Sequence, residues 1–492
     1  MKTSSLYRLT YIYLALPLFL FFLTWLRPEI AVLIGLLYGV AFYFSYPQYS
    51  DEKFIYSKKI LWLLFAIAFI WCFCGGIGYF YYQSFDYHFR NAVFRDLINF
   101  DWPVFYDRAN TPLVYYMAFW LVAAQLGKIL LFLGFNFDIV FYVSNILLLI
   151  YAILGTVLIF CHIIKATGAN SKKEIIIAVL GLVFFSGMDI IGYKFFIVEA
   201  QPFKYHLDWW ATFIQYSSHT TSMFWVFNQF IPTALIILLF YNERNIKNFG
   251  FLIAMSLFFA PYPTAGIGVF MVAYAIKMLI SAENKKDFIL DQIFSVTNII
   301  GVFWILPVVV LYFITNSEGM NGYYYVFNFT TPLRLLLFYT LEFLLYIVLI
   351  YPKCKKELLY WVIVVCLFLI PFMRVDNQNN FCMRASIPVI ILLTILVIKS
   401  MLYEKNKIIK YLLITVFLIG SVTPMVEFYR GFYYVSKAKR INLVTDEIET
   451  LNKQIVIMPL FLWDANHQFT AKNYGRDIFW QWLAKETKGL NK

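Results

Sequence analysis

Long apolar runs separated by short polar segments fill nearly the whole chain. They lie near residues 9–26, 29–46, 60–82, 113–133, 137–164, 174–196, 223–241, 248–260, 263–281, 289–315, 332–351, 357–373, 383–401 and 408–426. Many of them approach the roughly 20 residues that a helix needs to cross a hydrocarbon layer about 30 Å thick. Lipid offers no partners for backbone polar groups, and unbroken Leu, Ile and Phe runs lack the alternation of barrel strands. The pattern predicts an all-α, polytopic transmembrane protein.

The composition supports this fold class and narrows the chemistry. Of the 492 residues, 62% are hydrophobic and 14% are charged, whereas soluble domains carry about 25% charged residues. The six cysteines have neither zinc-ligand spacing nor the arrangement of an extracellular disulfide framework, so we expect them to be small core residues. The chain has no glycine-rich phosphate loop. We expect neither a cofactor nor a metal site.

Lys and Arg cluster between the apolar runs, and these clusters predict which runs cross, because basic short loops stay in the cytoplasm. If 113–133 does not cross, five clusters fall on the cytoplasmic side: Lys165/Lys172/Lys173, Arg244/Lys247, Lys277/Lys285/Lys286, Lys353/Lys355/Lys356 and Lys399/Lys405/Lys407/Lys410. Gln125 and Lys128 in the middle of that run are also costly at bilayer depth. We therefore expect about thirteen crossings, a cytoplasmic N-terminus with an uncleaved first span, and an outer C-terminus. The net charge of +12 forms no single basic stripe, so we expect no nucleic-acid partner.

This topology divides the chain into a transmembrane domain, 1–430, and a small non-cytoplasmic segment, 431–492. The polar residues then collect in outer loops at 83–136, 197–222, 316–331 and 374–384, whereas the cytoplasmic loops are short and basic. Pro261 and Pro263 break the stretch 248–281 into two helices. We expect 113–133 to lie along the interface or to re-enter, with Tyr115, Tyr116 and Trp120 at headgroup level.

The first outer loop carries the strongest candidate for acid–base chemistry. Asp86, Arg90, Val93 and Leu97 share one face of a predicted interfacial helix, and His88, on the opposite face, is a second candidate for proton transfer. Asp86 has two interpretations. It is a helix N-cap paired with Arg90, or it is a general base held at the membrane surface.

The later loops supply candidate substrate-binding residues. Arg384 enters an apolar run, where a guanidinium requires an anionic partner such as a phosphate, a salt bridge to Asp376, or snorkelling to the interface. Arg374 begins the same loop, and Arg90 of the first outer loop is a further candidate for substrate binding. Lys204 and His206 lie in the second loop, and Tyr324, with its aromatic neighbours, either stacks on a sugar or belongs to an aromatic belt. These candidates are expectations from the sequence.

The order of features from about residue 60 to 165 resembles the GT-C class of membrane glycosyltransferases, which includes protein O-mannosyltransferases and the aminoarabinose transferase that modifies lipid A. The resemblance is carried by an acidic residue soon after an early span, an interfacial helix, and Thr111-Pro112-Leu113 where the class has a Pro-Pro-Leu-like element. It implies inverting transfer from a polyprenyl-phosphate sugar, with Asp86 as the acidic residue of the loop. Many members carry a second acidic residue where this chain has Tyr87. That departure leaves Asp96 and Asp101 as alternative bases.

We therefore expect a glycosyltransferase in the bacterial plasma membrane. It would move a sugar from a polyprenyl-phosphate donor to an envelope glycan or lipid on the outer face. The protein itself would be surrounded by membrane lipids. Two alternatives stay open. One is a polymerase or ligase of lipid-linked polysaccharide. The other is a transporter or flippase, which usually shows matching halves with interrupted helices; in this sequence we expect only 248–281 to be interrupted.

Overall fold

The structure, a computed structural model, describes residues 1–46, 53–55, 57–197, 206–212, 214–316, 323–324, 332–375, 379–438, 450–451, 468–471 and 474–486. Nine helical segments within these ranges are long and apolar enough to cross a membrane. They are α1 (Thr3–Trp25), α2 (Pro28–Ser45), α6 (Phe137–Thr167), α9 (His219–Glu243), α11 (Pro261–Ser281), α13–α14 (Val296–Phe313), α15–α16 (Pro332–Cys354), α18–α19 (Asn380–Tyr403) and α20–α21 (Lys407–Lys437). The protein is thus an all-α polytopic membrane protein, and the number of thirteen crossings stays a prediction.

Shorter elements complete the bundle. The helices are α3 (Lys58–Cys74), α4 (Asp86–Asn99), α5 (Ala118–Phe132), α7 (Lys172–Val183), α8 (Asp189–Phe196), α10 (Phe249–Phe259), α12 (Lys285–Phe288) and α17 (Leu358–Leu369), with a 3₁₀ turn, η1 (Leu207–Ala211). Two antiparallel ribbons pair β1 (Phe105–Tyr106) with β2 (Thr111–Pro112) and β3 (Tyr323–Tyr324) with β4 (Arg374–Val375). α10 ends just before Pro261, which confirms the predicted break in 248–281.

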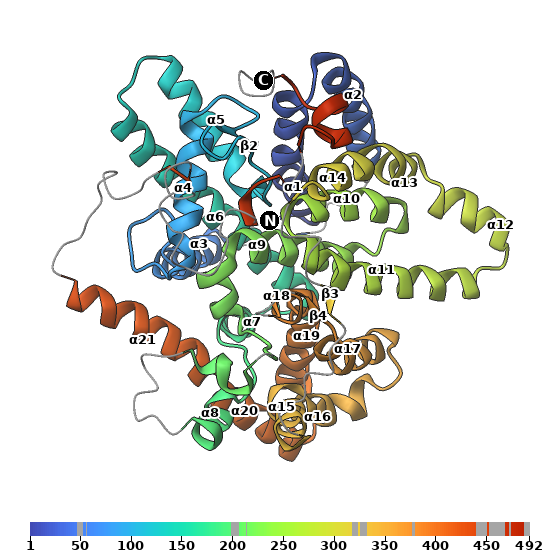
Figure 1. Cartoon of the computed structure of the whole chain (residues 1–492). Helices are drawn as coiled ribbons and strands as arrows, with labels where there is room; N and C mark the ends of the chain where they lie inside the picture. The colour runs from blue at the N-terminus through green and yellow to red at the C-terminus, as the bar shows by residue number, and fades with distance from the viewer. Residues whose placement is uncertain are drawn as a thin grey trace.

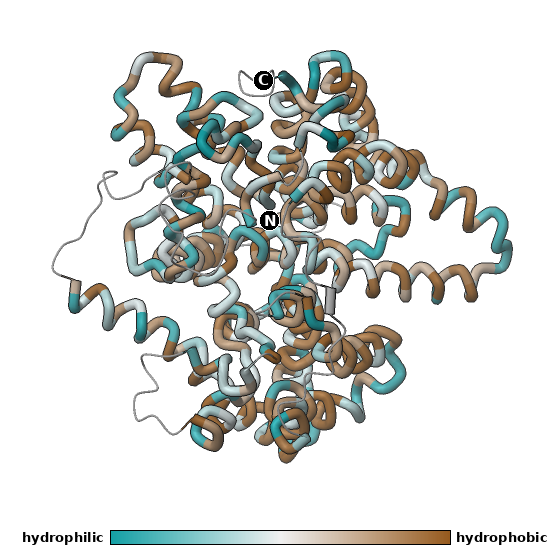
Figure 2. Tube along the Cα trace, viewed as in Figure 1, coloured by the Kyte–Doolittle hydropathy of each residue, from teal (hydrophilic) through white to brown (hydrophobic). Residues whose placement is uncertain are grey.

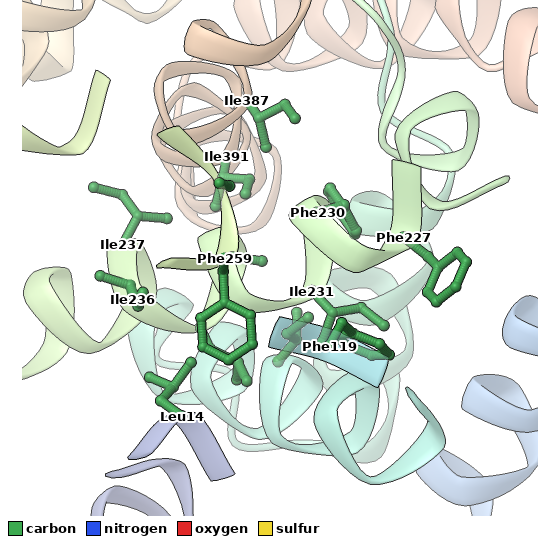
Figure 3. Close-up of a cluster of buried hydrophobic side chains, with 14 of the residues drawn as sticks. Leu14, Phe119, Phe227, Phe230, Ile231, Ile236, Ile237, Phe259, Ile387 and Ile391 are labelled. Atoms are coloured by element: carbon green, nitrogen blue, oxygen red, sulfur yellow. The ribbon is translucent and has the colours of Figure 1, made fainter. Parts of the chain in front are cut away.

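The core of the bundle forms around α9, which packs against α6, α19 and α10 (Figure 1). Figure 3 shows its Phe227 and Ile231 beside Phe119 of α5, with Leu14 of α1 and Ile391 of α19 in the same cluster. The peripheral helix α11 instead carries exposed Val and Ile side chains, and the tube in Figure 2 is largely brown along it. Water does not favour such a surface, so the outer faces are those expected to meet lipid.

The run 113–133 forms only a short helix. α5 has 15 residues, so it is about 22 Å long and shorter than the hydrocarbon layer. It begins deep in the bundle, where Phe119 packs on Tyr151 of α6, and ends near α4, where Lys128 Nζ donates to the carbonyl oxygen of Phe100. This path favours a re-entrant segment over a crossing.

Two expectations about this region and the next are wrong. Tyr115 and Trp120 are buried, at 3% and 1% exposure, so these rings pack inside the protein and do not form a headgroup belt. The run 174–196 is also interrupted: α7 ends at Val183 and α8 starts at Asp189. Between them, the backbone N–H of Met188 donates to the carbonyl oxygen of Leu341. A tertiary bond therefore replaces a helical one, and 248–281 is not the sole interruption.

The described parts of the C-terminal segment pack onto the transmembrane domain. Thr470 pairs with Leu113, and Ala484 pairs with Leu26 at the end of α1. The Thr111–Pro112 strand consequently lies between β1 and the chain around Thr470. α21 itself runs on to Lys437, past the expected domain boundary at 430.

Candidate functional site

A cavity of about 560 Å³ lies where the start of α4, the η1 turn, the first turns of α9, and α18 (Asn380–Ala385) meet. We call it the α4–α9 cavity. Its lining residues are Phe85, Asp86, His206, Trp209, Thr212, Gln215, Ser217, Thr221, Ser222, Trp225, Val226, Asn380, Met383 and Arg384. The volume is in the range of small-ligand sites. Folding therefore brings three sequence-predicted residues, Asp86, His206 and Arg384, to one cavity.

Asp86 begins α4 and pairs with Arg90 one turn later. The carboxylate Oδ2 lies 2.9 Å from Arg90 Nη2, which confirms the predicted i,i+4 pair. The predicted N-cap role is wrong, because the cap residue is Phe85 and no side chain bonds there. Arg90 also donates to the carbonyl oxygen of Trp225. That oxygen is available because α9 is kinked at Val226, where φ is −139° and ψ is 40°.

Arg384 places a buried guanidinium against the cavity. The residue is 8% exposed, and its hydrogen bond goes to the hydroxyl of Tyr116, at 3.3 Å. Its guanidinium carbon lies 5.8 Å from the centroid of the same ring. No carboxylate pairs with it among the described residues, and Asp376, the partner that the sequence suggested, lies outside them. A buried cation with only neutral partners is costly, so the site favours an anionic ligand.

His206 lines another side of the cavity and is backed by α21 (Val422–Lys437). Its Nδ1 lies 2.7 Å from Oε1 of Glu427, and Oε2 of Glu427 lies 3.1 Å from Arg430 Nη2. The ring of Trp225 packs edge-on against His206, with centroids 4.0 Å apart. Burial lowers the pKa of His206 below its ordinary value, although the Glu427 carboxylate opposes that shift. The imidazole is therefore neutral near pH 7.

Both ring nitrogens of His206 are buried and neither makes a hydrogen bond of regular geometry within the described part of the chain, although Nδ1 faces Oε1 of Glu427 at 2.7 Å. In the tautomer with its proton on Nδ1, directed to Glu427, the free Nε2 is a base. An imidazole oriented by a carboxylate in this way is a common device for proton transfer. The site thus contains a second candidate base besides Asp86, and it is the one not already paired with a guanidinium.

His206, Asp208 and Glu427 also form the group best suited to a metal ion among the described residues. Their candidate ligand atoms lie within 4.8 Å of one another, and all three residues are buried. Two of the three residues, however, already have other partners. Asp208 accepts from the hydroxyl of Thr221 at 2.7 Å, and Arg430 supplies the positive charge beside Glu427. A divalent cation at this position would compete with Arg430 for the Glu427 carboxylate.

Buried acidic residues continue from this wall into the bundle. The indole N–H of Trp210 lies within bonding distance of both Asp189 Oδ1 (3.3 Å) and Glu342 Oε1 (3.0 Å). No Lys, Arg or His among the described residues forms an ion pair with either acid. Burial, followed by the charges of Asp189 and Glu427, raises the pKa of Asp208 well above its ordinary value. The apolar runs gave no sign of this cluster.

The other sequence-predicted residues lie elsewhere. His88 is exposed and does not line the α4–α9 cavity. Arg374 forms strand β4 beside Tyr324 in register, and neither lines it. The side chain of Tyr324 and all of Lys204 lie outside the described residues.

Asp96 is buried near the far end of α4. It accepts from the backbone N–H of Leu451 at 2.9 Å and does not line the cavity. Burial raises its pKa to about 7, well above that of an ordinary carboxyl group. Since the folded state holds this proton longer than the unfolded state does, stability falls as pH rises between roughly 4 and 7.

We therefore expect Asp96→Asn to raise the melting temperature at pH 8, because the amide oxygen still accepts from Leu451 and no charge is buried. At pH 4.5, where Asp96 is protonated, the variant should melt close to wild type. The neighbouring, exposed Asp101→Asn is the control. A lower melting temperature of Asp96→Asn at both pH values would contradict this assignment.

No protein-family model matches the chain, and no curated protein and no solved structure is significantly similar to it.

Proposed function

We propose that the protein is a membrane glycosyltransferase that uses a polyprenyl-phosphate sugar and transfers it to an envelope glycan or lipid. The observation that carries the proposal is Arg384, a buried guanidinium at the wall of a cavity that also presents Asp86 and His206. A sugar phosphate supplies the anion that Arg384 lacks, and an acceptor hydroxyl needs a base nearby. Both requirements meet in one cavity.

The chemistry is an inverting displacement in this proposal. The acceptor oxygen attacks the anomeric carbon, a new C–O bond forms, and the bond from that carbon to the phosphate oxygen breaks. The polyprenyl phosphate leaves with the electron pair and is stabilised by Arg384. The acceptor proton passes to Nε2 of His206 or to the carboxylate of Asp86. No nucleotide or redox cofactor is required.

The proposed location is a bacterial plasma membrane with the α4–α9 cavity on the outer face. The basic clusters after α2, α6, α9 and α11 support this orientation through the positive-inside rule. A thiol reagent that cannot cross the membrane, added to intact cells, should label Gln83→Cys and spare Lys172→Cys. The reverse pattern would refute the orientation.

A transporter of lipid-linked glycans is the second candidate. Two observations favour it: the helices are interrupted between α7 and α8, and Asp189 and Glu342 form a buried acidic pair without a cationic partner among the described residues. Ionisable residues inside a membrane bundle often mark proton or ion paths. A transporter, however, makes no glycosidic bond, so detection of a transfer product separates the two candidates.

Purification with native lipids tests the proposal most directly. We expect a polyprenyl-phosphate sugar to co-purify with the wild-type protein and to be identified by mass spectrometry. It should be strongly depleted from Arg384→Gln, whereas the matched variant Arg374→Gln, at a residue outside the cavity lining, should retain it. Equal amounts in both variants, or a lipid without a phosphate, would overturn the proposal.

A further inference from the structure

A second cavity lies at the opposite end of the bundle. α9 contacts both cavities: Thr221 in its first turn lines the α4–α9 cavity, and Tyr241 in its last turn lines the second. The helix between Thr221 and Tyr241 separates the two cavities by about 30 Å, which is the thickness of the hydrocarbon core of a bilayer. The second cavity has a volume of about 340 Å³.

Four basic residues gather at this cavity, which we call the basic cavity. Arg244 caps the end of α9, Lys277 lies in the last turns of α11, Lys356 precedes α17, and Lys399 projects from α19 (Ile387–Tyr403). None of the four forms an ion pair among the described residues. The one acidic lining residue, Glu357, leaves a formal excess of three positive charges.

The remaining lining is aromatic and apolar. Tyr241 and Tyr274 flank the guanidinium of Arg244, with ring centroids 5.5 and 5.9 Å from its central carbon. Phe240, Phe270, Leu358, Leu359 and Val362 line the apolar part. A small free anion would gain nothing from these side chains. A molecule with a negative head and an apolar body matches both parts of the lining.

We propose that the basic cavity binds the headgroup of an anionic phospholipid, whose phosphate is held by Arg244 and Lys399 while its acyl chains lie against the apolar lining. The packing supports this because residues of α9, α11, α17 and α19 line the cavity. α11 and α19 contact each other, and each of them also contacts α9 and α17 (Figure 1). A lipid seated there would bridge four helices. Basic pockets between membrane helices bind acidic headgroups by the same means.

The prediction is a lipid-specific stabilisation. In nanodiscs, replacing phosphatidylcholine by phosphatidylglycerol should raise the melting temperature of the wild-type protein, and native mass spectrometry should detect retained phosphatidylglycerol. The double variant Arg244→Gln/Lys399→Gln should lose most of this shift and the retained lipid. The control Lys172→Gln/Lys173→Gln removes two exposed charges outside the cavity and should keep both.

Three results would overturn the proposal. The first is an equal melting temperature of the wild type in both lipids. The second is an unchanged phosphatidylglycerol shift and lipid retention in the double variant. The third is full stabilisation of detergent-solubilised protein by inorganic phosphate alone, which would make the cavity a site for free anions. If the double variant does not fold, the single variant Lys356→Gln, at the rim, should show a smaller shift than wild type.

Discussion

Replacing His206 by Gln is expected to lower the transfer rate by roughly 10²–10⁴, the usual effect of removing a general base. Asp86→Asn should lower the transfer rate by a smaller factor. The reason is geometric: one oxygen of the Asp86 carboxylate is already engaged by Arg90 at 2.9 Å. Nε2 of His206 has no such partner among the described residues. Rates would be measured with the donor that co-purifies with the protein.

The pH profile distinguishes the base from a residue that only supports the fold. Since burial lowers the pKa of His206, kcat/KM should begin to fall only below the ordinary histidine value of about 6.5. Glu427 is a positioning residue in this scheme. Its carboxylate stabilises the protonated ring, so Glu427→Gln should move the acidic limb to still lower pH. A structural defect would lower the rate without moving that limb.

A matched histidine provides the control for this prediction. His88→Gln changes an exposed side chain outside the cavity lining and should leave the rate unchanged. If His206→Gln retains the wild-type rate while Asp86→Asn loses it, the base is Asp86 and His206 takes no part in proton transfer.

Local patterns in the sequence predicted local structure well. Lipid allows few backbone conformations, so apolar runs translated directly into helices. The pair Asp86–Arg90 followed from a spacing of four residues, and the end of α10 followed from Pro261, which no helix interior tolerates easily. In each case the responsible groups are close together along the chain.

The missed features depend on contacts between distant segments. His206 and Glu427 come together only after folding. Glu427 directly follows the apolar run 408–426, where the sequence pattern indicates only the end of a span. The helix breaks before Asp189 although the run is apolar throughout. The break is stabilised by a hydrogen bond from the backbone N–H of Met188 to the carbonyl oxygen of Leu341, a residue distant in the sequence. Tyr115 has a side chain typical of membrane interfaces, yet it is buried.

The largest effect on donor binding is expected at Arg384. A charge-assisted hydrogen bond contributes about 1.5–3 kcal/mol, so Arg384→Gln should weaken donor binding by roughly 10- to 100-fold or more. Arg384→Lys keeps the charge but cannot form two parallel bonds to a phosphate. The donor affinity of Arg384→Lys should therefore lie between those of the wild type and Arg384→Gln. The measurement is the rise in melting temperature over a donor titration.

An apolar substitution separates ligand binding from stability. Because Arg384 is buried with no carboxylate partner among the described residues, Arg384→Met should match or exceed the wild-type melting temperature without donor, while its donor-induced shift disappears. A salt bridge to Asp376 predicts a different result. In that case Arg384→Met and Asp376→Asn would both lower the melting temperature without donor. Arg384 would then be a structural ion-pair partner and not a phosphate-binding residue.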